Sequence, residues 1–387
     1  MAGRRALLAP RAGAAAVAVA IGAATACSAG ATDVAVVSAP PAKTRAASPA
    51  ATFSSPDPQL WAAATLDKRA RCTVSAKLVP SCGAWWGVAP AAFTSTPPTT
   101  ALHDFEHKIG RTVDIFHAFH RGEQLFPTKE EMAIAREPGK RRILLLNWKP
   151  DWRHNWAEVA GGAMDGHIDR LAAHVNAHFP EKFFLVIHHE PEEEVRPIAG
   201  SGYTAADFRM MFRHVVSRLR AKGVHNALFT AVFMGSPKWG VKPWFDQLYP
   251  GNDVVDWLGM DPYASPDVRD FAHLVNKTSA AGRGFPGFYN WSAKIARGKP
   301  LMIAEWGAFA NGAQRAPGAR RTAGAQKAAF FNTVAAQLKR HPRIKALVYF
   351  ETPSGPFAGA TIDTRIDTSR TALDAFRALS GHSLLTH

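Results

Sequence analysis

Short apolar runs recur along the chain from about residue 83, and each is followed by polar residues and then by a helix-like pattern. Their centres are spaced by about 30 to 45 residues, the length of a strand and helix with their loops. Several runs are continuously apolar, which is typical of parallel strands buried on both faces. The eight predicted strands are 84–88, 113–119, 143–148, 183–188, 227–233, 254–260, 301–304 and 346–350.

Helical periodicity fills the intervals between these strands. Apolar side chains recur at three- and four-residue steps over 165–178, 204–220 and 326–339, and Thr204 is the expected N-cap of the second. Alternating strands and helices predict an α/β fold, a (β/α)8 TIM barrel in one domain over 71–387. A doubly wound sheet is the alternative, but no glycine-rich phosphate loop follows the first predicted strand.

The N-terminal region has the pattern of an export signal. Basic residues precede an apolar run over 12–26, which at about 15 residues is too short to span a bilayer comfortably. We therefore predict a signal peptide over 1–27. The small residues before Cys27 resemble a bacterial lipobox, in which the cysteine is lipidated, although Ala24 stands where Leu is usual. Lipidation of Cys27 and plain secretion both remain open.

Residues 28–70 are rich in Ala, Pro, Ser and Thr without amphipathic periodicity, which predicts a flexible tether. We therefore expect a protein that is secreted or lipid-anchored on the outer face of the bacterial cell membrane, with no other membrane contact. The remaining two cysteines, Cys72 and Cys82, form an even pair in an exported chain and predict a disulfide. Two free buried thiols are the alternative.

Composition excludes a disordered chain, since 47% of the 387 residues are hydrophobic and 20% are charged. The net charge of +15 raises the question of a polyanionic partner. The positive charges are scattered, however, and no nucleic-acid-binding motif accompanies the densest cluster, 140–142. We expect a basic surface, no nucleic-acid partner and a monomer.

Candidate chemistry gathers where the predicted strands end, which is where barrel enzymes place their active sites. Glu190 and Glu305 each end an apolar strand, the fourth and the seventh, that otherwise has no reason to carry a carboxylate. Two carboxyl groups about 5–5.5 Å apart are what double-displacement cleavage of a glycoside requires. Histidines, acids and aromatic residues accompany them at other strand ends: Trp86, His117, His120, Asn147, Trp148, His188, His189, Asp261, Tyr263 and Trp306.

These residues carry a resemblance to glycoside hydrolase family 26, a clan A family of β-mannanases and some β-glucanases and xylanases. The placement of the two glutamates on strands four and seven is similar to that clan, and His189-Glu190, rather than Asn-Glu, is similar to the family. The segment 257–263, WLGMDPY, resembles its sixth strand, and 304–307, AEWG, resembles its nucleophile motif. The resemblance covers roughly 83–353.

The resemblance implies roles for individual residues. Glu190 would be the acid/base, Glu305 the nucleophile, His189 a sugar contact, and Tyr263 the partner of the nucleophile carboxylate. It implies a retaining endo-β-glycosidase, without cofactor or metal, that acts on a β-1,4-linked polysaccharide or oligosaccharide: mannan first, β-glucan or xylan second. Two departures are that 191–194, PEEE, brings no aromatic residue after the acid/base, and that strand eight ends in Phe350 where Trp is common.

The predicted substrate-binding residues combine polar groups with aromatic rings on which sugars stack. They are His189, His120, Trp148, Asp261, Tyr263, Trp306 and Trp86. Strand alternation places His188 and Glu190 on one face, so that His189 reaches the site only if the strand end kinks. The acidic run 192–194 is expected to be a solvated loop.

Two other functions remain open. The histidines at 117, 120, 188 and 189 could assemble a metal site for a polysaccharide deacetylase, since imidazole and carboxylate suit zinc. The chain could instead be a carbohydrate-binding lipoprotein on a barrel scaffold. No cluster of basic residues is evident at the strand ends, which favours a neutral sugar backbone.

Overall fold

Eight parallel strands close into a barrel in the computed structural model, which describes residues 72–150, 153–265, 267–279, 284–309, 323–353 and 363–385. The predicted signal peptide and tether, with Cys27, lie outside the described residues. The barrel strands are β1 (Trp85–Ala89), β2 (Ile115–Arg121), β3 (Ile143–Lys149), β4 (Phe183–Ile187), β5 (Ala227–Phe233), β6 (Trp257–Met260), β8 (Leu301–Ala308) and β9 (Ile344–Phe350).

Each strand pairs with the next along the chain, and β1 also pairs with β9. The ring closes between β6 and β8, while the two-residue β7 (Tyr263–Ala264) pairs separately with β8. The predicted (β/α)8 barrel is therefore confirmed. The doubly wound alternative is wrong, because that fold is an open sheet with two free edges.

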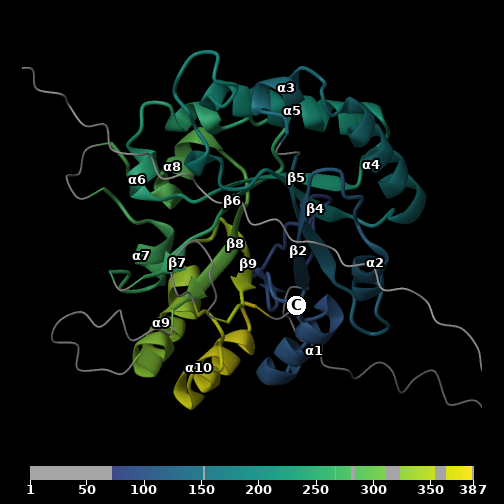
Figure 1. The fold of residues 1–387 in the computed structure, drawn as a ribbon. Coiled ribbons are helices and arrows are strands. Elements are labelled where there is room, and N and C mark those ends of the chain that lie inside the picture. Colours follow the sequence, from purple (N-terminus) through teal and green to yellow (C-terminus); the bar gives the residue numbers. More distant parts are fainter. Residues whose placement is uncertain are drawn as a thin grey trace, which may run out of the picture. The chain divides into compact units, whose positions relative to one another are not determined.

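Helices surround this ring of strands (Figure 1). The predicted helix over 165–178 is α4, and the predicted 204–220 is α5, where the Thr204 hydroxyl accepts a hydrogen bond from the Asp207 amide. The α-helices are α1 (Pro98–Ile109), α2 (Lys129–Ala135), α3 (Trp156–Ala160), α4 (Asp165–His178), α5 (Ala205–Ala221), α6 (Pro237–Gly240), α7 (Phe271–Val275), α8 (Phe288–Ile295), α9 (Ala323–Leu338) and α10 (Arg370–Ser380), with short 3-10 turns η2 (Pro191–Glu193) and η3 (Phe245–Leu248).

Alternate residues of each strand enter two different apolar layers. In β4, Phe184 and Val186 belong to the cluster that fills the barrel, while Phe183, Leu185 and Ile187 pack against the surrounding helices. This is why the strands are continuously apolar in sequence: both of their faces are buried. The two faces also decide which strand-end side chains can reach the barrel mouth.

A disulfide-bonded loop covers the opposite end of the barrel. Cys72 and Cys82 are bonded, with Cα atoms 5.6 Å apart, so the predicted disulfide is confirmed. Within the loop, the Leu78 carbonyl accepts a hydrogen bond of 2.7 Å from Trp85 Nε1, and the Lys77 carbonyl accepts one of 2.7 Å from Trp257 Nε1. Both tryptophans begin barrel strands, so the loop closes the N-terminal floor of the barrel.

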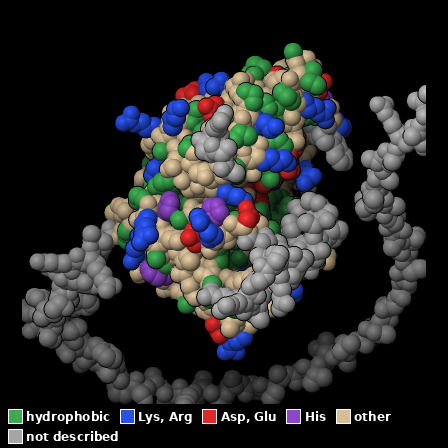
Figure 2. Space-filling view, turned by 90° about the vertical axis from the view of Figure 1, so that its left-hand side faces the viewer, with side chains coloured by type: hydrophobic (Ala, Val, Ile, Leu, Met, Phe, Trp, Pro, Cys, Tyr) green, Lys and Arg blue, Asp and Glu red, His purple; other side chains and the backbone are tan. Residues whose placement is uncertain are grey.

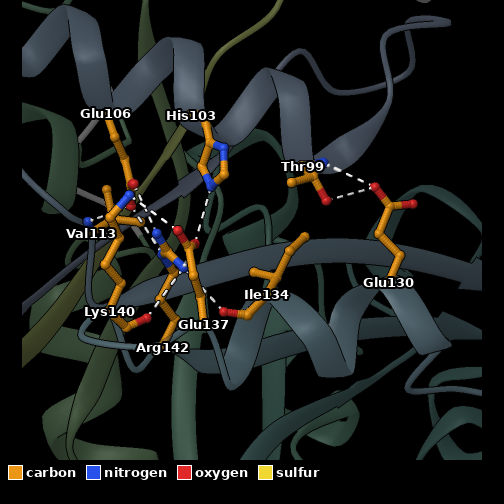
Figure 3. Close-up of polar contacts among 9 residues, drawn as sticks. All are labelled: Thr99, His103, Glu106, Val113, Glu130, Ile134, Glu137, Lys140 and Arg142. Carbon is orange, nitrogen blue, oxygen red and sulfur yellow. Dashed lines mark hydrogen bonds and ion pairs between the residues drawn. The ribbon is translucent and has the colours of Figure 1, made fainter. Parts of the chain in front are cut away.

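A buried ion pair also fixes this end of the fold (Figure 3). Arg142, directly before β3, donates to both carboxylate oxygens of Glu106 in α1, at 2.9 and 2.8 Å, and also to Glu137 at 2.7 Å. The Arg142 side chain has no exposed surface. Arg142 belongs to 140–142, the densest positive cluster of the sequence, so one of the three charges of this cluster is buried in an ion pair.

On the face shown in Figure 2, the basic side chains do not gather into one patch. Figure 2 shows the left-hand side of Figure 1, where Lys and Arg side chains are interspersed with acidic and apolar ones. Among the described helices, none combines the length and the apolar character needed to cross a bilayer.

Candidate active site

The chain kinks where β4 ends, and the kink determines which residues face the barrel mouth. His188 and Glu190 have positive φ angles of 52° and 53°, which are uncommon for residues other than glycine. His188 turns outward, where its ring lies 5.2 Å from that of Trp156. His189 instead turns inward, with Nε2 4.0 Å from Glu305 Oε1. The family resemblance, and not simple strand alternation, therefore predicts the histidine that faces the site.

A β-bulge brings Glu305 into the same space. The pairs Ile303–Leu347 and Trp306–Tyr349 are both in register, yet β8 has two residues between them and β9 has one. Such an extra residue lets two neighbouring side chains lie on the same face of the sheet. Tyr263, from β7, donates a hydrogen bond of 2.9 Å from its hydroxyl to Glu305 Oε2. The predicted contact between these two side chains is therefore present.

The two glutamates share an environment that favours protons. Burial raises the pKa of Glu190 to about 7, although the nearby Lys149 charge opposes the change. Burial, followed by the charge of Glu190, raises the pKa of Glu305 to about 8, and the Tyr263 hydroxyl opposes it. Two mutually repelling carboxyl groups in one buried site therefore hold a proton near neutral pH.

Two further acids extend this cluster. Asp261 follows β6, and burial together with the Glu305 charge raises its pKa well above its usual range. Glu192, in η2, is fully buried; its Oε1 accepts a hydrogen bond of 3.2 Å from the Gly235 amide, and burial raises its pKa to about 8. The prediction that 192–194 is a solvated loop is therefore wrong for Glu192, because η2 turns its side chain inward, where the Gly235 amide after β5 donates to it.

The inward faces of β2 and β3 add neutral polar groups. Burial lowers the pKa of His117 to about 3, and the side chain of Asn147 lies close enough to oppose this. His189 is likewise buried, and its pKa is well below its usual range because of burial and the Lys149 charge. Uncharged imidazole rings can donate one hydrogen bond and accept another, which suits sugar hydroxyls.

Four predicted substrate contacts require correction. Trp86, Trp148 and Trp306 are fully buried in the layer between strands and helices, where Trp86 and Trp306 have ring centroids 5.9 Å apart. Their ring faces are not available to a sugar. His120 also points outward, with Nε2 3.0 Å from Glu131 Oε1 of α2. All four occupy outward positions of their strands, and residue type at a strand end does not reveal which face is taken.

Phenylalanines line part of the barrel mouth. Phe119 and Phe350 occupy inward positions at the ends of β2 and β9, and their rings lie 6.2 Å apart. Phe93, in the loop after β1, is 50% exposed and its ring lies 4.8 Å from that of Phe119. Phe350, which stands where the resembled family commonly has Trp, thus keeps an aromatic residue at the end of this strand. Alternation from His117 along β2 is the signal that could have identified Phe119.

The four histidines considered for a metal site are divided between two faces. His117 and His189 lie inside the barrel mouth, whereas His120 and His188 lie outside it. Over the described ranges, no three His, Cys, Asp or Glu side chains are grouped to hold a metal ion. The deacetylase alternative therefore has no assembled ligand set in this part of the chain.

Comparison of the sequence with known proteins finds a relative among glycoside hydrolases. No family model matches the chain. It is 27% identical over 240 residues to Endoglucanase H of Acetivibrio thermocellus, a match that covers 60% of this chain and 25% of that protein. The chain thus spans about a quarter of the length of this curated relative.

Solved structures with a similar fold include family 26 β-mannanases. A ruminal endo-β-1,4-mannanase is 14% identical, with a TM-score of 0.50 over 78% of this chain and 64% of that one. A β-mannanase from Bacteroides ovatus is 14% identical, with a TM-score of 0.51 over 79% of this chain and 90% of that one. At such identities the likeness establishes the fold.

Proposed function

We propose that this chain is a retaining endo-β-glycosidase. The observation that carries the proposal is the pair Glu190 and Glu305, brought together at the ends of β4 and β8, with Tyr263 hydrogen-bonded to Glu305. A buried pair of carboxyl groups at the mouth of a barrel suits double displacement at an anomeric carbon. Similarity to an endoglucanase in sequence and to β-mannanases in fold supports the same chemistry.

In the first step, Glu305 attacks the anomeric carbon while Glu190 gives its proton to the departing glycosidic oxygen. The step requires the shared proton of the pair to lie on Glu190, and the Tyr263 hydroxyl favours this arrangement because it stabilises the ionised form of Glu305. In the second step, Glu190 removes a proton from water, which attacks the anomeric carbon and releases the Glu305 carboxylate. The anomeric configuration is therefore retained.

The neighbouring residues orient the sugar and the nucleophile. Neutral His189, 4.0 Å from Glu305, is placed to hydrogen-bond a hydroxyl of the sugar at the cleaved bond. Asp261 is buried beside Glu305, and its two carboxyl oxygens have no hydrogen-bond partner among the described residues. A buried polar group of this kind is satisfied by a ligand or by water. Asp261 thus joins His189 and Tyr263 as a substrate-binding residue.

The proposed substrate has a β-1,4-linked neutral backbone, with mannan first and β-glucan or xylan second. The printed names of the similar proteins, β-mannanase and endoglucanase, support this choice. The proposal includes export by the signal at 1–27, with or without lipidation at Cys27, and action as a monomer. The acid/base is followed by η2 instead of an aromatic platform, which predicts weak contacts on the leaving-group side.

The decisive experiment combines two substitutions with product analysis. Glu305→Ala should abolish turnover on every substrate, while Glu190→Ala should remain active on aryl glycosides with good leaving groups. Azide should rescue Glu190→Ala and give a β-glycosyl azide, because a small anion needs no general base. Glu181→Gln, at a surface ion pair with Arg136, is the matched control. Inverted product by NMR, or near-normal rates in Glu305→Ala, would contradict the assignment.

A further inference from the structure

A cavity lies at the C-terminal ends of β2, β3 and β4. Its volume is about 590 Å³, within the range of small-molecule sites. Side chains from the three loops that follow these strands form its walls. Those that matter here are Arg121, Lys149, Trp156, His188, Glu194 and Tyr203.

The cavity contains two cations on adjacent strands. Arg121 ends β2 and Lys149 ends β3, and they are register partners in the parallel ladder, so their backbones are about 4.8 Å apart. Arg121 and Lys149 each lie two residues beyond an inward-facing residue, Phe119 and Asn147, so strand alternation places them on the face of β2 and β3 that leads to the barrel mouth. The Lys149 charge also opposes the rise in the pKa values of Glu190 and Glu305. A ligand in the cavity would therefore lie on the barrel-mouth side, toward the proposed catalytic pair.

The two acidic side chains described in the cavity wall, Glu194 and Glu123, are already paired. Glu194 accepts a hydrogen bond from Lys149 Nζ at 2.9 Å, and its other carboxylate oxygen lies 3.1 Å from His188 Nε2. Glu123, at the rim, is paired with Arg170 at 3.1 Å. Arg121 has no ion pair with any described residue and its side chain is exposed. The cavity thus contains a guanidinium group available to an anion.

The remaining wall is apolar and aromatic. Trp156 is buried and packs edge-on against Tyr203, with ring centroids 5.3 Å apart, so it supports the Tyr203 ring without presenting its own face. The half-buried Tyr203 ring is the aromatic surface that the wall offers to the apolar face of a sugar, beside the positive charge. A carboxylate on a sugar ring would match both features at once, because a guanidinium binds a carboxylate through two parallel hydrogen bonds.

We propose that this cavity binds a carboxylate-bearing sugar of the glycan, a hexuronate, whose carboxylate is held by Arg121. The inference rests on the proposed function and narrows its substrate: the cleaved bond joins neutral sugars, and an acidic sugar lies nearby as a branch or as a chain neighbour. It also corrects the expectation from sequence that no basic cluster lies at the strand ends. Arg121 and Lys149 belong to different predicted strands, and only the register brings them together.

The test measures binding to the full chain carrying Glu305→Gln, which prevents turnover. Calorimetry would compare xylotetraose with xylotetraose bearing one glucuronic acid branch, and cellotetraose with cellotetraose oxidised to a carboxylate at one terminal C6. The acidic member of one pair should bind about ten- to a hundredfold more tightly, and the preference should weaken as salt is raised. The pair that shows the preference distinguishes a branch from a chain neighbour.

Adding Arg121→Gln should remove the preference and leave binding of the neutral oligosaccharides unchanged. Arg121 has no side-chain partner among the described residues, so the variant should fold normally. Arg136→Gln, at a remote ion pair, is the matched control. A preference that survives Arg121→Gln, or equal affinity for both members of each pair, would overturn the inference. Binding without any hydrolysis by the wild type would instead overturn the proposed function alone.

Discussion

Removing one hydroxyl group tests the proposed division of labour between the two glutamates. Tyr263→Phe deletes the donor that lies 2.9 Å from Glu305 Oε2 and leaves the ring in place. The ring stacks against Phe309 with centroids 5.6 Å apart, so the variant should keep its packing. The substitution therefore changes the charge balance at Glu305 with little effect on the shape of the site.

The expected magnitude follows from the bond that is lost. A hydrogen bond to a charged group is worth about 1.5–3 kcal/mol, and one pKa unit corresponds to about 1.36 kcal/mol. The pKa of Glu305 should therefore rise by about one to two units above that of the wild type. Because Glu305 must be ionised to attack, a higher pKa leaves it protonated over a wider range of pH.

The assay is the pH dependence of kcat/KM, which reports the ionisation of the free enzyme. The acidic limb of the profile should move upward by about one to two pH units, with a much smaller change in the basic limb. Tyr249→Phe is the matched control, since the Tyr249 hydroxyl bonds Asn252 at 2.8 Å outside the site. An unchanged acidic limb in Tyr263→Phe, with reduced kcat alone, would refute the argument.

Three further predictions concern stability. The pKa of Glu192 is raised to about 8, so its ionisation should cost the wild type stability as pH rises from about 4.5 to about 8. Glu192→Gln removes this contribution and should lose less stability than the wild type between pH 5 and pH 8 in thermal melts; an equal loss in both proteins would contradict this. Arg142→Met leaves the Glu106 carboxylate buried without its cation and should lower the free energy of unfolding in urea by about 3–5 kcal/mol. A second substitution, Glu106→Gln, should restore part of this loss, and equal stability of the single and double variants would contradict the argument. Cys82→Ala should lower stability by roughly 2–4 kcal/mol and leave kcat nearly unchanged, because the disulfide loop lies at the end of the barrel opposite Glu305; a large loss of kcat in folded protein would count against it.

The strands and helices could be predicted from the sequence because burial on two faces produces a simple pattern. All eight predicted strands overlap barrel strands, and α4 has the predicted bounds. The predicted strand over 301–304 ends early, because β8 continues through Glu305 to Ala308. A charged residue breaks an apolar pattern even where the strand continues, so the functional residue concealed the true end of the strand.

The sequence predicted the two carboxylates of the candidate site, but it did not predict which aromatic residues surround them. Glu190 and Glu305 stand out as acids at the ends of apolar strands, whereas Trp148 and Trp306 lie at similar strand ends and face the helices. The difference is a matter of strand face, which depends on the kink after β4 and the bulge in β8. Neither irregularity has a signature in composition or periodicity.

The extra residue in β8 limits how this part of the chain can change in length. Removing one residue between Ile303 and Trp306 would leave one residue on each strand, so the ladder would become regular with both flanking pairs kept in register. The bulge would then be lost, and with it the arrangement that lets two neighbouring side chains lie on the same face. Such a deletion would spare the barrel and misplace the proposed nucleophile, Glu305. Variation here is therefore expected by substitution and not by insertion or deletion, and a designer who transplants the nucleophile should move 303–307 as one segment of fixed length.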